Sequence, residues 1–465
     1  MDFGTSNSTA AWFDGVALRY VAFENASPVL PTAIHMDRSY TAITGTDAID
    51  RYVEENRNRL VELVPEVIGE ASTALGGGEL GDSENQLDTP RQFIYGQLVD
   101  RGLPGRLFHG LKRLLGDPNI ERLSVFARPY RLVALITPVL LRMRSAIEKD
   151  TRRRVDSVHA GRPVNFEGSH HARNLVGTKR LLEAYEHAGF RGALFFPEPV
   201  AATLSYLWRE RPAAQGIALT VDFGGGTLDL SVVRFAGTEF EVLATDGIAL
   251  GGNRIDQLIF KRMLFPLLGD GEWYARRVEG RLIESPFPFE EFEVGLLNWP
   301  ITHMLNESRT KTKVMDAVAG GGSAVDKFER LKDLIAYNYS YNCFQSIKRA
   351  KAELSDRTET VIDIPELNLS IPFTRTQLSD ILSDEFDNLR VLIDTLLSRV
   401  HLQRADVSLV IRTGGSSLIV AVKTLLESMF PDKVAAHDPF TSVAGGLAIA
   451  NYFGYAFDWE SEKDL

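Results

Sequence analysis

The chain has 465 residues, of which 44% are hydrophobic and 24% are charged, and its formal net charge is −11 at pH 7. This length predicts more than one domain or lobe, and the acidic balance argues against a nucleic-acid partner. Cys343 is the single cysteine, which excludes an internal disulfide and predicts a reducing compartment, the cytoplasm. No apolar run is long enough to cross a bilayer, so neither a membrane partner nor a signal peptide is expected.

The first unit with chemical meaning is the run Asp2-Phe3-Gly4-Thr5-Ser6, which leads into a short apolar strand. Glycine lets a bulky anion approach backbone N–H groups, and hydroxyl side chains can donate to phosphate oxygens. An aspartate at the end of a strand is suited to a hydrated cation. Only Met1 precedes Asp2, so we expect the strand that leads into this turn to be shortened.

Helices and strands alternate over the next two hundred residues, which predicts an α/β sheet with ligands at the strand ends. Helices are predicted over 47–67, 106–118, 128–149, 167–188 and 200–208, and strands over 155–160 and 193–196. The Gly/Ser/Asp-rich segment 74–90 is typical of a surface loop.

Two charged residues in this region are candidates for catalysis. Lys112, on the predicted short helix, can neutralise a transferring phosphoryl group or orient an attacking water, although most lysines next to an arginine are only solvated. Glu198 lies between two prolines at a strand end, which is a rigid place for a general base or for a group that binds the water shell of a metal. An ordinary loop glutamate is an equally good interpretation of Glu198.

The aspartate–aromatic–glycine phrase recurs at 222–227, where Asp222 and Phe223 precede Gly224, Gly225, Gly226 and Thr227. Apolar residues before it and alternating residues after it predict a strand, a tight turn and a returning strand. Two copies predict two related lobes that face each other across a nucleotide. Asp2 and Asp222 would then hold a hydrated Mg²⁺, and Thr5, Ser6 and Thr227 would contact phosphates. Two ordinary hairpins with Asp caps are the alternative.

The remaining sequence predicts a nucleoside site. Helices are expected over 327–353 and 376–400, a β-hairpin over 360–373 and a strand over 406–412, whereas 258–325 has no clear pattern. Lys348, Lys351 and Ser355 share one helix face, which can reach a ribose and a base. Gly414 and Gly415 allow close approach to the backbone, although a plain tight turn is the simpler interpretation.

Eight motifs follow one another in the order of a known family: DFGTSN, LKRLLG, GRPVNF, PEPVAA, VDFGGGTLDLS, LGGNRID, KRAKAELS and RTGGSS. In this the chain resembles the ATPase domain of the DnaK-type heat-shock protein 70 family, within the actin and sugar-kinase superfamily. It is most similar to stand-alone members that lack the peptide-binding half. The resemblance implies an α/β, two-lobed actin-like ATPase fold, built from a duplicated ribonuclease H-like unit and divided into four subdomains.

The resemblance also implies roles for individual residues. Asp2 and Asp222 hold Mg²⁺ through water, Lys112 positions the hydrolytic water, Glu198 supports the metal and Pro163 senses the γ-phosphate. Nucleotide-binding positions, for ATP or ADP, are Gly4, Thr5, Ser6, Gly224, Gly225, Gly226, Thr227, Gly251, Gly252, Lys348, Lys351, Ser355, Gly414, Gly415 and Ser416.

Three departures from the family pattern affect the nucleoside end. Ala352 and Leu418 stand where the family has arginines that sandwich the adenine, and Lys348 replaces a glutamate. We therefore expect weaker or differently arranged base stacking. No interdomain linker or peptide-binding domain is expected within the chain.

The resemblance predicts lobe I over 1–215, with a core at 1–34 and 118–215 and a tip at 35–117. Lobe II spans 216–465, with a core at 216–252 and 373–465 and a tip at 253–372. The long 253–372 tip is either a surface for a protein partner or an insertion, and we favour the insertion. Slow ATP hydrolysis that changes lobe closure, as in a molecular chaperone, is the predicted function. The alternatives are a sugar-type small-molecule kinase, a filament-forming protein and a degenerate nucleotide-binding scaffold.

Overall fold

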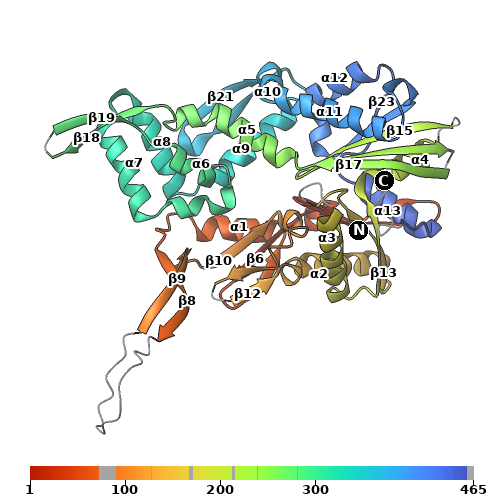
Figure 1. Ribbon diagram of the computed structural model, residues 1–465, viewed down its shortest axis with the longest axis horizontal. Helices are drawn as coiled ribbons and strands as arrows, with labels where there is room; N and C mark the ends of the chain where they lie inside the picture. Colours follow the sequence, from red (N-terminus) through yellow and green to blue (C-terminus); the bar gives the residue numbers. More distant parts are fainter. Residues whose placement is uncertain are drawn as a thin grey trace, which may run out of the picture.

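The computed structural model describes residues 1–72, 91–126, 128–166, 171–211, 215–237, 239–279 and 281–457. The N-terminal and C-terminal parts of the chain form two halves stacked on each other (Figure 1). The last helix, α13 (Ser442–Phe453), returns to lie beside the N-terminus between the two halves. A hairpin of β8 (Leu63–Ser72) and β9 (Arg91–Asp100) projects away from the rest of the molecule.

The N-terminal half is built from small sheets and the helices that cover them. Its strands are β1 (Asp2–Phe3), β2 (Asn7–Thr9), β3 (Ala11–Phe13), β4 (Leu18–Tyr20), β5 (Val29–Pro31), β6 (Ala33–Asp37), β7 (Ala42–Thr44), β10 (Gly105–His109), β11 (Arg122–Val125), β12 (Arg128–Arg131), β13 (Ser157–Arg162) and β14 (Gly192–Pro197). Its helices are α1 (Thr46–Glu55), α2 (Leu132–Thr151), α3 (His171–His187) and α4 (Glu198–Glu210). The parallel pair β13–β14 ends at Pro197, so Glu198 begins α4 at a strand end.

The C-terminal half is organised around a five-stranded sheet in the order β17-β16-β15-β22-β23. These strands are β15 (Gln215–Phe223), β16 (Leu228–Ala236), β17 (Glu239–Ile248), β22 (Leu409–Thr413) and β23 (Val434–Ala436). Two hairpins, β18 (Trp273–Val278) with β19 (Arg281–Pro286) and β20 (Glu359–Ile364) with β21 (Leu369–Thr374), lie apart from it. The helices are α5 (Gly252–Met263), α6 (Glu290–Leu296), α7 (Ser308–Gly320), α8 (Val325–Ala336), α9 (Ser340–Glu353), α10 (Arg375–Ile381), α11 (Ser383–Arg399) and α12 (Val420–Met429).

The cores explain why the two halves hold together as one molecule. Among the described residues, one large apolar core joins β1, α2, β13 and α3, and another fills the C-terminal half around β15, β16, α5 and α9. A third cluster packs α4 against α13 through Val200, Leu204 and Leu447. Because α4 belongs to the N-terminal half and α13 to the C-terminal half, this cluster holds the two halves together where α13 lies.

Sequence patterns located the strands better than the helix ends. The hairpin predicted over 217–233 is confirmed as β15–β16, and the one predicted over 360–373 as β20–β21. The predicted strands at 155–160, 193–196 and 406–412 correspond to β13, β14 and β22. The predicted loop 74–90 lies outside the described residues.

Several predicted helices are shorter than expected or divided. The helix predicted over 47–67 ends at Glu55, and the one over 128–149 begins only at Leu132, because β12 pairs with β11. The prediction of a helix over 106–118 is wrong: β10 occupies its first part, and Lys112 lies in a single 3-10 turn, Leu111–Leu114. Asn338, at φ +55°, divides the predicted 327–353 helix into α8 and α9. The predicted 376–400 helix is divided at Leu382, which lies between α10 and α11.

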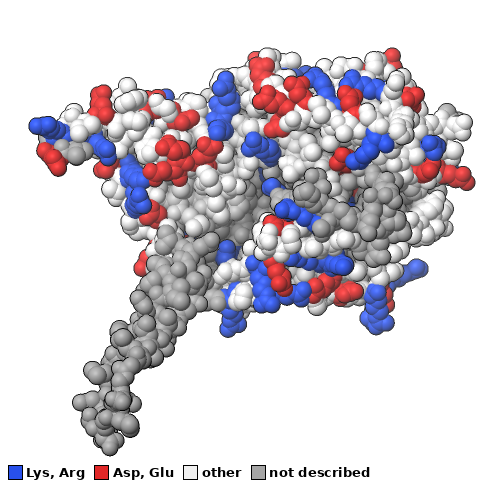
Figure 2. Space-filling view, in the orientation of Figure 1, with Lys and Arg blue, Asp and Glu red and all other residues white. Residues whose placement is uncertain are grey.

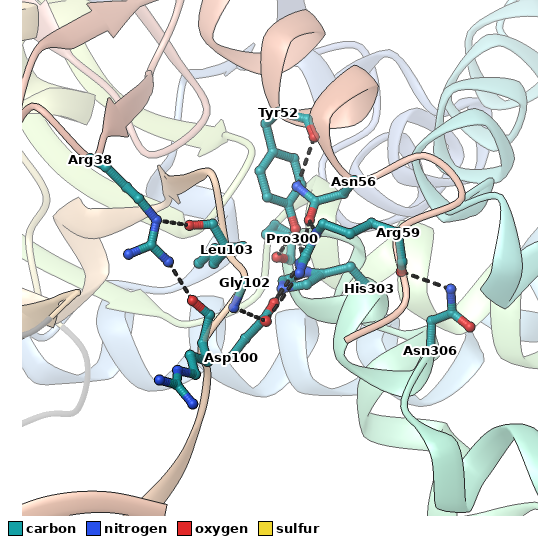
Figure 3. Close-up of polar contacts among 11 residues, drawn as sticks. Arg38, Tyr52, Asn56, Arg59, Asp100, Gly102, Leu103, Pro300, His303 and Asn306 are labelled. Carbon is teal, nitrogen blue, oxygen red and sulfur yellow. Dashed lines mark hydrogen bonds and ion pairs between the residues drawn. The ribbon is translucent and has the colours of Figure 1, made fainter. Parts of the chain in front are cut away.

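A polar junction joins the two halves at the end opposite α13 (Figure 3). The Tyr52 hydroxyl on α1 contacts His303 Nδ1 at 2.7 Å and donates to the backbone oxygen of Pro300. Asn306 Nδ2 donates to the backbone oxygen of Arg59 at 2.8 Å, and Arg59 forms an ion pair with Asp100. These side chains bridge the halves across sequence separations of more than 240 residues. We call this set of residues the tip junction.

Charged side chains mix over both halves on the face shown in Figure 2, where the described residues form no continuous basic surface. No helix in the described part of the chain is both long and apolar enough to cross a membrane.

Candidate functional site

A cleft of about 480 Å³ lies between the two halves, and residues from both line it. It brings together predicted site residues that are far apart in sequence. Those that line it are Asp2, Gly4, Thr5, Ser6, Glu198, Asp222, Gly224, Gly225, Gly226, Thr227, Gly252, Lys348, Lys351, Ser355, Gly414, Gly415 and Ser416. Gly251 packs directly against two of these residues, since a side chain there would collide with the backbone of Gly225 and Gly226. Lys112 reaches the cleft through its ion pair with Glu198.

The two aspartate–glycine turns meet face to face in this cleft. In β15–β16 the backbone N–H of Gly224 donates to the oxygen of Thr227 at 3.0 Å, which closes the turn. A Cβ atom on Gly225 would lie 2.7 Å from Ser6 Oγ, and one on Gly226 would lie 2.7 Å from Thr5 Oγ1. Glycine is therefore required at both positions by the close approach of the opposite turn. The residues of both turns, with the hydroxyl side chains of Thr5, Ser6 and Thr227, line the cleft beside this contact.

Beside the turns, four carboxylates surround one ammonium group. Lys112 forms a buried ion pair with Glu198, and Asp2, Asp222 and Asp229 lie close enough to influence it or one another. Burial, with repulsion from Glu198 second, raises the pKa of Asp2 to about 7 and that of Asp229 to about 7. Burial also raises the pKa of Asp222. The carboxylates Glu198 and Asp2 outweigh burial at Lys112 and raise its pKa.

This excess of negative charge fits a cation held through water. Asp2 Oδ1 is buried and has no hydrogen-bond partner among the described residues. No group of three or more His, Cys, Asp or Glu side chains gathers closely enough to hold an ion directly, within the part of the chain that the structure describes. Mg²⁺ typically keeps several of its waters and takes few protein ligands. Asp2 and Asp222 therefore suit a hydrated Mg²⁺ better than a directly ligated ion.

Asp229 is a residue that the sequence analysis missed. It lies opposite Asp222 in the β15–β16 register and is buried. Its Oδ2 accepts from Thr227 Oγ1 at 2.6 Å, and its Oδ1 accepts from the backbone N–H of Val164 at 3.0 Å. Asp229 thus connects the phosphate turn to the segment after Pro163. The signal was available, because a four-residue turn between paired strands places residues 222 and 229 side by side.

The raised pKa of Asp229 predicts how stability depends on pH. Between about pH 4 and about pH 7 the folded protein binds more protons than the unfolded chain, so stability falls as the pH rises through that range. We expect Asp229→Asn to raise the melting temperature of the nucleotide-free protein by about 2–4 °C at about pH 8, and by clearly less near pH 5, where the folded carboxyl is protonated. Thermal unfolding in EDTA checks this. Asp363→Asn, an exposed residue on β20, is the control, and an equal shift at both pH values would contradict the prediction.

The nucleoside end of the cleft is formed by α9 and by the turn after β22. Lys351 Nζ binds Asp256 Oδ1 at 2.5 Å, and Ser416 Oγ donates to the backbone oxygen of Gly224 at 3.1 Å. Gly414, at φ +82°, packs so closely on Phe223 that a side chain would collide with its backbone. Asp256 and Asn253, whose Nδ2 donates to Ser6 Oγ at 3.0 Å, were also missed by the sequence analysis, because only the folded chain brings α5 to these residues.

Comparisons with known proteins find one family-model match and several distant relatives. Residues 123–265 match a family model described as Hsp70 protein. Heat shock 70 kDa protein BIP3 of Oryza sativa subsp. japonica is 24% identical over 98% of this chain and 56% of its own length. The matched segment and the relatives covering most of the chain thus show similarity to the heat-shock protein 70 family. Chaperone protein DnaK of Cenarchaeum symbiosum is 23% identical over 83% of the chain and 50% of its own length. A chaperone protein HscA homolog of Pseudoalteromonas atlantica is 29% identical over 44% of the chain and 32% of its own length.

The mixed α/β architecture of two stacked halves agrees with this similarity to the heat-shock protein 70 family. The chain spans about half the length of the curated relatives that it matches over most of its own length. The family model covers β12, α2, β13 and the whole β15–β16 hairpin, so the 224–227 turn lies inside the matched region.

Proposed function

We propose that this chain binds ATP with Mg²⁺ in the cleft and hydrolyses it slowly, as the nucleotide-binding part of a DnaK-type molecular chaperone. The observation that carries the proposal is the contact between the two aspartate–glycine turns, at Gly225 with Ser6 and at Gly226 with Thr5. Such a pair of turns presents hydroxyls and N–H groups to a polyphosphate from both sides. The similarity to the heat-shock protein 70 family and the buried Lys112–Glu198 pair support the same function.

The proposal divides the chain into lobe I (1–215) and lobe II (216–465), each with a core and a tip, which makes four subdomains of duplicated ribonuclease H-like origin. The core of lobe I would comprise 1–34 and 118–215, and that of lobe II 216–252 and 373–465. The apolar core around β1, α2, β13 and α3 lies wholly within lobe I and supports this division, whereas the larger core of the C-terminal half also includes Ala33, Ala48, Ile49 and Tyr52. The cytoplasm would be the compartment, in keeping with the single, buried Cys343.

Asp2 and Asp222 would hold Mg²⁺ through water, with Glu198 behind them. When bound, the ion supplies charge neutralisation on the β- and γ-phosphates. The turns at 4–6 and 224–227 would bind the phosphates through backbone N–H groups and the hydroxyls of Thr5, Ser6 and Thr227. On the nucleoside side, Lys348, Lys351 and Ser355 would contact ribose and base, together with Gly414, Gly415 and Ser416.

The proposed reaction is an in-line attack of water on the γ-phosphorus, which breaks the bond to the β-phosphate oxygen and yields ADP and phosphate. Lys112 would orient the attacking water and offset the charge that develops on the γ-phosphoryl group. Its ion pair with Glu198 fixes the ammonium group, because both side chains are buried. No covalent intermediate is required, so positioning and charge stabilisation supply the catalysis.

Phosphate release tests the proposed activity. Protein freed of nucleotide and mixed with a slight excess of ATP and Mg²⁺ should release about one phosphate per chain in a slow single phase, and EDTA should stop the release. ADP as the only nucleotide product, with no dependence on added sugars, separates hydrolysis from a sugar-type kinase. A protein that binds ATP but releases no phosphate would contradict the proposed enzyme activity.

The tip junction predicts a control on nucleotide exchange, since it would have to separate when the lobes open. Tyr52→Phe removes the hydroxyl that contacts His303 and Pro300, and we expect ADP release to become about 5–10-fold faster, as loss of about 1 kcal/mol of hydrogen bonding implies. Displacement of a fluorescent ADP analogue in a stopped-flow instrument measures the rate. Tyr337→Phe, an exposed tyrosine outside the junction, is the matched control. An unchanged release rate would show that the junction does not limit opening.

A protein partner at the 253–372 tip also remains a proposal. The β18–β19 hairpin at its end exposes Trp273 and Leu282, which are 58% and 69% accessible. Apolar side chains of this size on a projecting hairpin favour a protein contact over a purely structural insertion.

A further inference from the structure

We infer that Phe440 stacks on the base of the bound nucleotide and takes over the part that arginines play in the resemblance described above. The inference rests on the proposed function, since it concerns the nucleoside end of the same cleft. Phe440 lies in the loop between β23 and α13 and lines the cleft together with Leu418 and Ala352. Its side chain is 50% exposed, and no contact between its ring and another aromatic ring is found among the described residues.

The loop holds Phe440 in a fixed place. The Asp438 carboxylate accepts hydrogen bonds from the backbone N–H groups of Phe440, at 2.9 Å, and Thr441, at 2.8 Å. Thr413 Oγ1, at the end of β22, donates to the backbone oxygen of Asp438 at 2.7 Å and lies 2.6 Å from Ser442 Oγ. The loop is thereby tied to the central sheet. These bonds fix the backbone at Phe440, so only the side-chain torsions of the ring have to be ordered when a ligand covers it.

The ring lies close to the turn that precedes Ser416. A Cβ atom on Gly415 would lie 3.1 Å from Cε1 of Phe440, so a side chain there would require the ring to shift by a few tenths of an ångström. The ring therefore lies over the same turn that brings Ser416 to the phosphate hairpin, where Ser416 Oγ donates to Gly224. A nucleotide whose phosphates lie between the turns would bring its base to this end of the cleft.

The chemistry of the surrounding wall favours stacking over charge recognition. Leu418 is 38% exposed on the cleft wall and Ala352 carries only a methyl group, so neither offers a cation to the face of a base. Lys351 is engaged by Asp256. An exposed aromatic ring and an exposed leucine together bury the faces of a purine, and stacking on an aromatic side chain contributes roughly 1–3 kcal/mol per base. Phe440 and Leu418 thus supply affinity for the base of the nucleotide that the missing arginines would otherwise supply.

Titration of the parent and of Phe440→Ala with two probes, ATP and inorganic tripolyphosphate, both with Mg²⁺, tests the inference. We expect Phe440→Ala to weaken ATP binding about tenfold or more and to leave tripolyphosphate binding unchanged, because tripolyphosphate has no base. Phe440→Trp should bind ATP at least as tightly as the parent, and ATP should quench the new indole. Trp273→Ala, an exposed aromatic residue on β18, should match the parent with both probes.

The possible outcomes distinguish a failure of the stacking role of Phe440 from a failure of the proposed function. Equal ATP affinity of Phe440→Ala and the parent would overturn the stacking role. An equal loss of affinity for both probes would also overturn it, since the residue would then only support the fold of the cleft. A parent that binds neither probe would instead refute the proposed function itself.

Discussion

Replacing Lys112 with alanine should slow ATP hydrolysis by at least about 100-fold while ATP affinity stays within a few-fold of the parent. Loss of one positioned group that stabilises developing charge typically reduces the rate by about 100- to 1,000-fold. Lys112 is the one cation buried within the carboxylate cluster among the residues that the structure describes, and it contacts Glu198, which lines the cleft. Single-turnover phosphate release at saturating ATP isolates the chemical step from binding.

The neighbouring Arg113 supplies the matched control for Lys112. It lies in the same 3-10 turn but is exposed, and Arg113→Ala should hydrolyse ATP at close to the parental rate. Lys112→Ala also leaves Glu198 without its buried partner, so the variant should be less stable and must be assayed well below its melting temperature. Parental hydrolysis by a folded Lys112→Ala protein would show that Lys112 has no catalytic role.

Asp222→Asn should weaken ATP binding in the presence of Mg²⁺ by roughly 100-fold, because a carboxylate near a divalent ion contributes several kcal/mol at short range. Without Mg²⁺ the sign should reverse: the variant should bind ATP as well as the parent or better, since a negative charge beside the phosphates has been removed. The nucleotide-free variant should also melt at a higher temperature, because burial and the neighbouring carboxylates raise the pKa of Asp222 in the parent.

A titration with and without EDTA measures both arms of this prediction. Asp363→Asn, an exposed aspartate on β20, should behave as the parent in each. If Asp222→Asn lost the same affinity with and without Mg²⁺, the residue would act on the nucleotide directly or on the fold, and the proposed hydrated metal site would be wrong.

The fold was predictable where local patterns decide it. A glycine turn between an apolar run and an alternating run defines β15–β16 within a few residues, and its second copy at Asp2 indicated that two turns would face each other. Helix ends were less predictable. The 128–131 segment pairs with β11 instead of extending α2, and the run around Lys112 is divided between β10 and a 3-10 turn, because partners distant in sequence determine both.

The site was predictable to a similar degree. Predicted site residues from both halves line one cleft, whereas their catalytic and binding roles remain predictions. Asp229 was missed although its strand was predicted, because its importance depends on the cross-strand register with Asp222. The Lys351–Asp256 ion pair and the tip junction join residues about 95 and 250 positions apart, and no local pattern reports such contacts.

Calorimetric titration of nucleotide-free protein with ATP and Mg²⁺ measures the nucleotide binding on which every role assigned above depends. We expect one ATP per chain, binding that weakens when Mg²⁺ is removed, and loss of most of the metal-dependent part in Asp222→Asn. Absence of binding at millimolar ATP with Mg²⁺ present, by a protein shown to be folded, would contradict the proposed function.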